Sequence, residues 1–285
     1  MSSAMSSALY VRLRAALAPA GRNGRFARDR PATVGRMEHS KAAEALVEQN
    51  TLLADLTHAG DPAAPVPTCP GWTLRQLVKH VGRGHRWAAA IVRDRAQDPV
   101  DPATVPGGKP PRDQDGTTAW LTESPSVLFD AVTATGADTP VWTFTGPKPA
   151  GWWIRRRLHE AVVHHADAAI ALGAPFAVDP AVAADGVSEW LSLLSARTVD
   201  EPLLAAGATM HLHATDDGLG AAGEWLVRAG GTGVEWEHGH GKGAAAVRGT
   251  AADLLLVLLR RVPADRVEVH GDAGILDTWL ARTPF

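Results

Sequence analysis

The feature that most constrains the fold is a change in hydrophobic period after Glu201-Pro202. Before this point, apolar residues recur every three or four positions, which is the period of an amphipathic helix. Glycine, proline and capping residues divide this part into five expected helices, over 38–60, 73–93, 117–134, 151–172 and 180–197. Pro125 is expected to break the first half of the third helix, because proline lacks the N–H of the helical hydrogen bond. We therefore predict a helical bundle over 37–200.

After the change, short segments alternate between apolar and polar residues and are separated by glycine-rich turns. This alternation is typical of β-strands. The expected strands are 210–213, 225–228, 234–237, 245–248 and 267–270, with helices over 250–260 and 273–280. The sequence thus predicts a second, smaller α+β domain over 201–285.

Charge and cysteine content limit the possible partners and compartments. Residues 1–36 contain seven arginines and one aspartate, a net charge of +6, and are expected to form a basic, disordered leader. Since the whole chain carries −3, the remainder carries −9 and has no basic footprint for nucleic acid. The longest apolar run, 254–259, is far shorter than the roughly 18 residues that span a bilayer. The single cysteine, Cys69, excludes an intrachain disulfide and a cysteine-rich zinc cluster, and is consistent with the cytoplasm.

A metal site is the main chemical hypothesis from the residues. Glu160 and His164 are four positions apart in the fourth expected helix, so both side chains leave the same face. His80, on the apolar face of the second helix, is a candidate third ligand, although a lone histidine on such a face is more often a core residue. Three nitrogen and oxygen ligands leave one coordination position of a zinc ion open.

Several neighbours have two interpretations. Asp167 could accept a hydrogen bond from a ligand imidazole, or it could be a surface charge at a helix end. His159 and His165 are turned away from the face of Glu160 and His164, and we expect them to pack or to lie on the surface. Cys69 has no neighbouring base and is expected to be structural. Two further histidines in a glycine-rich turn, His238 and His240, suggest a second metal site only weakly.

Three motifs together resemble the mycothiol-dependent maleylpyruvate isomerase family. They are Thr68-Cys69-Pro70-Gly71-Trp72-Thr73, Leu77-Val78-Lys79-His80-Val81 and the Glu160, His164, Asp167 set, followed by a similar C-terminal stretch from Gly249 to Leu256. The resemblance implies a DinB-like four-helix bundle followed by a small α/β sterol-carrier-like domain. It also implies zinc bound by His80, Glu160 and His164, and mycothiol as co-substrate.

The resemblance further implies that an arginine of the C-terminal domain reaches the substrate. Arg261 matches that position best, with Arg260 beside it. A guanidinium can hold a carboxylate through two hydrogen bonds, but a cation at a helix C-terminus is also favoured by the helix dipole alone.

The function expected from these observations is that of a metal-dependent, mycothiol-using isomerase or S-transferase acting on a small electrophile. A cation favours thiolate over thiol, and the thiolate is the nucleophile. Two alternatives stay open: a metal-assisted hydrolase that needs no thiol, and a non-catalytic module that binds small ligands. The sequence indicates neither the substrate nor the oligomeric state.

Overall fold

The protein consists of two compact units. The computed structural model describes residues 37–196, 202–230 and 233–283, so the expected leader 1–36 lies outside the described residues. One unit extends from Met37 to Phe176, and the other begins at Ala177. The sequence placed the boundary between the two domains near residue 200, whereas the structure divides before the fifth helix, α6 (Pro180–Ser195). The physical reason is that α6 packs against the helix α7 (Ala251–Leu258) and the strand β5 (Val234–His238) of the second unit.

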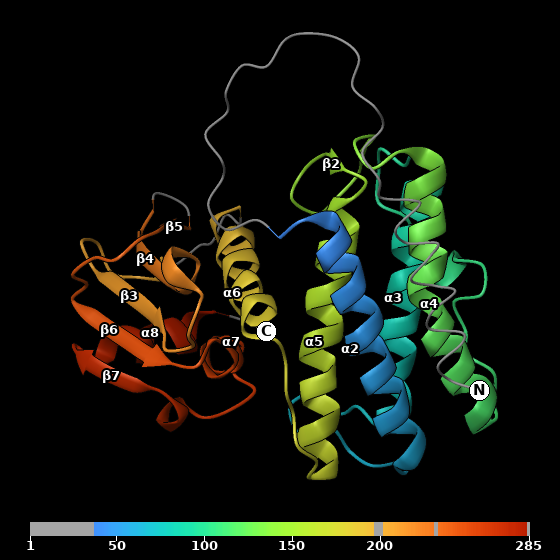
Figure 1. The fold of residues 1–285 in the computed structure, drawn as a ribbon, viewed down its shortest axis with the longest axis horizontal. Helices are drawn as coiled ribbons and strands as arrows, with labels where there is room; N and C mark the ends of the chain where they lie inside the picture. Colours follow the sequence, from blue (N-terminus) through green and yellow to red (C-terminus); the bar gives the residue numbers. More distant parts are fainter. Residues whose placement is uncertain (1–36, 197–201, 231–232, 284–285) are drawn as a thin grey trace, which may run out of the picture. The chain divides into compact units, whose positions relative to one another are not determined.

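The first unit is a four-helix bundle made of α2 (His39–Ala59), α3 (Leu74–Arg93), α4 (Gln114–Thr135) and α5 (Trp152–Leu172) (Figure 1). α2 packs against α5 and α4, and α3 packs against α4 and α5. A short 3-10 helix, η1 (Pro102–Thr104), lies between α3 and α4. A two-stranded ribbon of β1 (Pro140–Val141) and β2 (Lys148–Pro149) lies between α4 and α5.

Local signals account for the start of α3 and its buried face. Thr73 and Gln76 form the expected capping box, in which the backbone N–H of Thr73 donates to Oε1 of Gln76 at 2.7 Å. Leu74, Leu77 and Val81 follow at helical spacing and are at most 1% exposed. This helix therefore presents a fixed apolar face to the bundle, which also fixes the direction of His80.

Pro125 does not break α4, contrary to the expectation from the sequence. Proline at this position removes the N–H that would donate to the carbonyl oxygen of Leu121. That oxygen instead accepts from Nδ2 of Asn50 on α2 at 2.8 Å and from Oγ of Ser124 at 2.6 Å. Because the carbonyl is satisfied from outside the helix backbone, α4 continues through Pro125.

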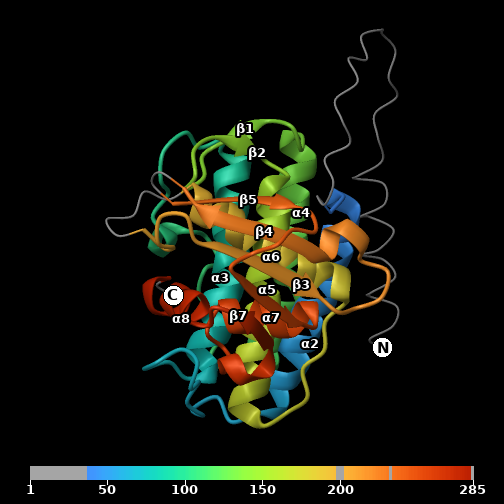
Figure 2. The same cartoon turned by 90° about the vertical axis from the view of Figure 1, so that its left-hand side faces the viewer.

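The second unit is a five-stranded sheet covered by helices. The strands are β3 (Thr209–Ala214), β4 (Glu224–Ala229), β5 (Val234–His238), β6 (Ala245–Gly249) and β7 (Glu268–Gly271), in the order β5-β4-β3-β6-β7. Only β3 and β6 pair in parallel among these strands. α6 and α7 (Ala251–Leu258) lie on the same side of the sheet (Figure 2). The remaining elements are η2 (Gly220–Gly223), η3 (Ala264–Arg266) and α8 (Gly274–Arg282).

The expected fold class, a helical bundle followed by a small α/β unit, is confirmed.

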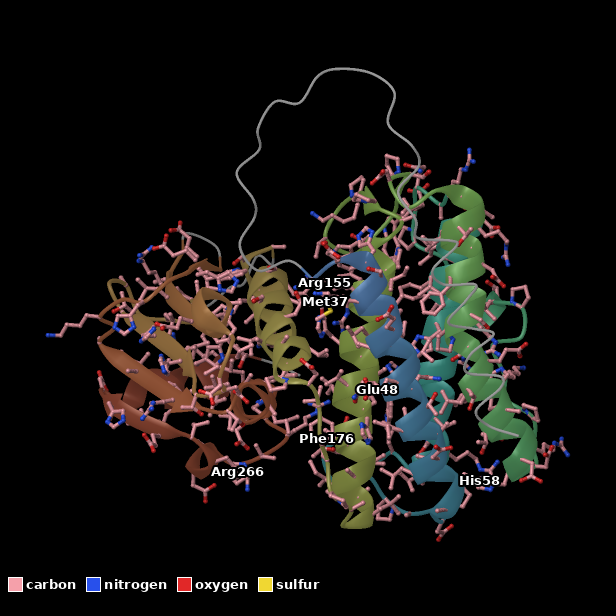
Figure 3. All side chains as sticks on the ribbon, in the orientation of Figure 1. Met37, Glu48, His58, Arg155, Phe176 and Arg266 are labelled. Carbon is pink, nitrogen blue, oxygen red and sulfur yellow. The ribbon has the colours of Figure 1, made fainter. Side chains whose placement is uncertain are left out.

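Side chains link the bundle helices to one another. For example, Nδ1 of His58, near the end of α2 in Figure 3, lies 3.0 Å from the hydroxyl of Thr118 on α4. Within the described residues, no helix is both long enough and apolar enough to cross a membrane.

Candidate metal centre and cavity

Two helices bring the three expected metal ligands together. His80 comes from α3, and Glu160 and His164 come from successive turns of α5. Nε2 of His80 lies 3.2 Å, and Nε2 of His164 lies 3.7 Å, from the same oxygen, Oε2 of Glu160. The two imidazole rings meet edge to face, with their centroids 4.8 Å apart. The helical spacing of Glu160 and His164 and the packing of α3 against α5 are sufficient to produce this arrangement.

The donor set fits a zinc-like ion. Two ligands at tetrahedral angles, each about 2.0–2.2 Å from an ion, lie about 3.3–3.6 Å apart. The separations of 3.2 and 3.7 Å from Glu160 are close to this range, and all three ligand atoms lie within 4.8 Å of one another. Imidazole nitrogen and carboxylate oxygen are both common zinc ligands, so only small side-chain movements separate this geometry from a three-ligand site.

Asp167 lies directly behind His164. Its Oδ2 is 2.8 Å from Nδ1 of His164, and its Oδ1 accepts from the hydroxyl of Thr68 at 2.6 Å. The carboxylate is fully buried. A proton held on Nδ1 by this hydrogen bond leaves Nε2 of His164 with a free lone pair directed toward Glu160.

Cys69 forms part of the same group, because its thiol lies 3.4 Å from Oδ2 of Asp167. Cys69, His164 and Asp167 therefore also lie close enough together to be considered as ligands. Both oxygens of Asp167 already accept hydrogen bonds, however, so we interpret Cys69 and Thr68 as supports for this carboxylate.

Two arginines on α5 hold Glu160, and neither was expected from the sequence to have a role. Arg156 pairs with Oε1 of Glu160, and Nη1 of Arg157 lies 3.3 Å from Oε2. Arg157 is 4% exposed, and a Cβ atom at Gly84 would lie 2.4 Å from its Nη2. Gly84 thus makes room for the guanidinium. Glu160 follows Arg156 by four residues and Arg157 by three, and this helical spacing could have predicted both pairs.

A buried hydrogen-bond chain positions Arg157. Its Nε donates to Nδ1 of His85 at 3.2 Å, and Nε2 of His85 is 3.2 Å from Oδ1 of Asn50. Since Nδ1 of His85 accepts a hydrogen bond from Arg157, Nε2 of the neutral ring carries the hydrogen that is donated to Asn50. Burial, followed by the charges of Arg157, Arg86 and His80, holds the pKa of His85 well below its usual 6.5. His85 is therefore neutral and accepts the hydrogen bond that orients Arg157.

Two of the three ligand candidates, His80 and Glu160, line a cavity of about 520 Å³. Besides His80 and Glu160, its wall includes aromatic rings, among them Trp72 and Trp153. It also includes four basic side chains: Lys79, Arg83, Arg156 and Arg157. Burial is the largest cause of a pKa of about 3 for His80, and the nearby His164, Arg157, Arg156 and Arg83 lower it further. The His80 ring is consequently neutral near pH 7, which is the form that binds a metal.

The remaining candidates lie elsewhere. His159 and His165 are buried, and Nδ1 of His165 is 2.9 Å from Oε1 of Gln49. Arg261 belongs to the second unit, follows α7, is 8% exposed and donates from Nη1 to the carbonyl oxygen of Leu259 at 3.0 Å. The structure thus places His80, Glu160 and His164 together within the first unit, and Arg261 in the second.

His238 and His240, which the sequence suggested only weakly as a second metal site, do not belong to one group of possible metal ligands in the described residues. His238 lies 3.4 Å from Oγ of Ser188 on α6, whereas Nδ1 of His240 lies 2.7 Å from Oε2 of Glu224. Gly239 between them has a φ of +153°, so the alternation of side chains along β5 does not continue to His240.

Comparison with known proteins decides the family. The model of the mycothiol maleylpyruvate isomerase N-terminal domain matches residues 41–169, and that of the MDMPI C-terminal domain matches residues 181–278. The chain belongs to the mycothiol-dependent maleylpyruvate isomerase family. This membership confirms the resemblance and supports a thiol-dependent isomerase. The domain match ends before α6 and resumes within it, in agreement with the division of the structure at Phe176.

Solved structures give the same fold. A crystal structure described as the mycothiol-dependent maleylpyruvate isomerase aligns with a TM-score of 0.55 and 15% identity, covering 85% of this chain and 97% of that one. A histidine-to-alanine mutant of an enzyme of the same description aligns with the same values. No curated protein gives a significant match. At this identity, the family's fold is shared while most side chains differ.

Proposed function

We propose that this family member is a metal-dependent, mycothiol-using isomerase or S-transferase that acts on a small electrophile in the cytoplasm. The observation that carries the proposal is the convergence of the His80 and His164 imidazoles on one oxygen of Glu160, at the wall of a cavity that His80 and Glu160 line. His80, Glu160 and His164 would hold the ion, with zinc the best match to the donor set. When bound, the ion supplies the positive charge that keeps a thiol deprotonated near neutral pH.

The chain's own residues would organise the reaction around that thiolate. Asp167 fixes the tautomer of His164, and Arg156 and Arg157 fix the carboxylate of Glu160. The rings of Trp72 and Trp153 give the cavity an apolar wall that limits the access of water.

The basic side chains that line the cavity favour an anionic electrophile. Lys79 and Arg83 suit a carboxylate, and their positive charges would offset its negative charge so that a conjugated carboxyl group can accept the electrons of the addition. In an isomerase, the sulfur electron pair forms a C–S bond while the π pair moves onto the conjugated carbonyl. Rotation about the new single bond and return of the electrons expel the thiolate and leave the trans alkene. In a transferase, the adduct is protonated and released.

Arg261 is proposed as a further carboxylate-binding residue, on the strength of the family resemblance. Replacing Arg261 with lysine keeps the charge but removes the two-pronged hydrogen bonding of the guanidinium. We expect a higher KM for a carboxylate substrate and, because Arg261 is buried and bonded to the Leu259 carbonyl, only a small decrease in melting temperature. A lower melting temperature with an unchanged KM would assign Arg261 to packing only.

The deciding experiment uses cobalt as a spectroscopic substitute for zinc, in protein purified without a metal-affinity tag. Addition of mycothiol to the cobalt protein should produce a sulfur-to-metal charge-transfer band, which His164→Ala should abolish and Asp130→Asn, an exposed change on α4, should retain. A cobalt spectrum that mycothiol does not alter would contradict the proposal. Turnover of an ester or amide without thiol would then favour the hydrolase, and absence of both metal and turnover would favour a ligand-binding module.

A further inference from the structure

A second group of metal-binding side chains lies on the sheet of the C-terminal unit. His211 and His213 are two residues apart on β3, so they project from the same face. Glu224 is the direct cross-strand partner of His213 at the start of β4. Met210 and Leu212 alternate with the histidines and are fully buried in the core. The histidine face is thus the face opposite the core, and α6 and α7 lie on the other side (Figure 2).

A loop brings a fourth donor to this group. His240 follows β5, and the positive φ of Gly239 turns the chain so that the His240 ring lies above β3. The His240 and His211 rings meet edge to face with centroids 5.1 Å apart. Three separate segments of the second unit therefore contribute to one cluster.

The three histidine side chains converge on the carboxylate of Glu224. Nε2 of His211 and Nδ1 of His240 lie 3.0 and 2.7 Å from Oε2 of Glu224, and Nδ1 of His213 lies 3.6 Å from Oε1. One ligand atom from each residue can be chosen so that all four lie within 4.8 Å of one another. Ligand atoms bound to one zinc-sized ion are about 3.3–3.6 Å apart, so the cluster needs only a small contraction to surround an ion.

We propose that His211, His213, Glu224 and His240 form a second divalent-metal site, separate from the site in the helical bundle. Three imidazoles and one carboxylate match zinc, nickel, cobalt or copper(II), and do not match magnesium or calcium, which prefer oxygen ligands alone. Four protein ligands also close a tetrahedral shell, which is the mark of a structural site. The ion would tie the loop at His240 to β3 and β4.

The surroundings are compatible with a cation. His211 is 5% exposed, so water competes little with an ion for its ring nitrogen. Arg248, the neighbour of His213 across the β3–β6 pair, is paired with Glu268 at 3.7 Å, which offsets its positive charge. Without a metal, the same contacts would be ordinary hydrogen bonds from the histidines to Glu224. The experiment must distinguish this explanation from a metal site.

The test is the stoichiometry of zinc binding to the full chain, freed of metal with a chelator and carrying no histidine tag. Equilibrium dialysis is applied to wild type, His164→Ala, His240→Ala, the double variant and His270→Ala. His240 is exposed, so its replacement should leave the fold intact, which circular dichroism checks. His270 is an exposed histidine of β7 outside the cluster and serves as the matched control.

We expect two tight equivalents of zinc in wild type and in His270→Ala, one in each single-site variant and none in the double variant. Loss of the His240 ligand should weaken the second site about 100-fold or more, because even losing a hydrogen-bond partner behind a ligand costs about 10- to 100-fold. If His240→Ala binds as much zinc as wild type, the proposal is overturned and the cluster is a hydrogen-bonded histidine group. Because His164→Ala tests the bundle site alone, failure of one site does not imply failure of the other.

Discussion

Asp167 connects three side chains of the bundle site through one buried carboxylate. It accepts from Thr68 and lies within hydrogen-bond distance of Cys69 and Nδ1 of His164. Replacement with asparagine keeps the shape but exchanges one acceptor oxygen for a donor. We expect Asp167→Asn to lower zinc affinity of the bundle site about 10- to 100-fold, as is usual for the partner behind a ligand imidazole.

Competition with a chromophoric chelator measures this change, with His240→Ala as the common background so that only the bundle site binds zinc. Asp130→Asn, the same substitution at an exposed position of α4, is the control. An affinity equal to that of the background protein would mean that Asp167 supports only the fold.

The sequence was informative about residues that are close together along the chain. The helical spacing of Glu160 and His164 placed both on one face. His80, 80 positions before Glu160, was only a weak candidate from its own helix, and the family resemblance strengthened it. The chain from Arg157 through His85 to Asn50 was not recognisable, because its bonds join residues 72 and 35 positions apart. Such contacts depend on which helices pack together, and apolar periodicity does not specify that.

At the scale of elements, Asn50 is a test of why α4 continues through Pro125. Asn50→Ala leaves both the Leu121 carbonyl and Nε2 of His85 without this partner. We expect the free energy of unfolding to fall by about 1–3 kcal/mol, the usual cost of leaving a buried polar group unsatisfied. Urea denaturation followed by far-ultraviolet circular dichroism measures the change.

Pro125→Ala provides the complementary test. A helical proline usually costs about 3 kcal/mol, but the Leu121 carbonyl already has two donors, so the gain from alanine should stay below about 1 kcal/mol. Alanine should recover part of the Asn50→Ala loss, because its N–H can supply the carbonyl. A gain near 3 kcal/mol from Pro125→Ala alone would show that the native helix is strained there.

Elements that depend on local sequence were predicted correctly, and features that depend on distant partners were not. The five expected strands correspond to β3–β7, because alternation and glycine turns are local signals. The expected break at Pro125 and the grouping of α6 with the bundle did not agree with the structure, because each depends on a partner far along the chain: Asn50 for the first, and α7 and β5 for the second.

At the scale of the whole molecule, the buried neutral His85 should make the bundle sensitive to acid. Its folded pKa lies well below 6.5, whereas an unfolded histidine titrates near 6.5. Below pH about 6.5 the unfolded chain therefore binds more protons than the folded chain, so stability falls as the pH falls. The charged and titratable neighbours are Arg157 of α5 and Arg86 and His80 of α3, which all oppose protonation.

Urea midpoints measured between pH 7.5 and 5 should decrease for wild type and decrease less steeply for His85→Gln. Glutamine cannot take up the proton, although it can still donate to Asn50. Equal slopes for the two proteins would place the acid sensitivity in other groups. The comparison uses slopes, so a uniform loss of stability in the variant does not affect it.

The cavity wall has a kinetic consequence. Lys79, Arg83, Arg156 and Arg157 outnumber the single carboxylate of Glu160 in its lining. Such a surplus attracts anions from beyond contact distance, over about 8–10 Å at ordinary ionic strength. Salt should therefore slow the binding of an anionic substrate while leaving the turnover of the bound substrate almost unchanged. At low substrate concentration, the reaction would be fastest at low ionic strength.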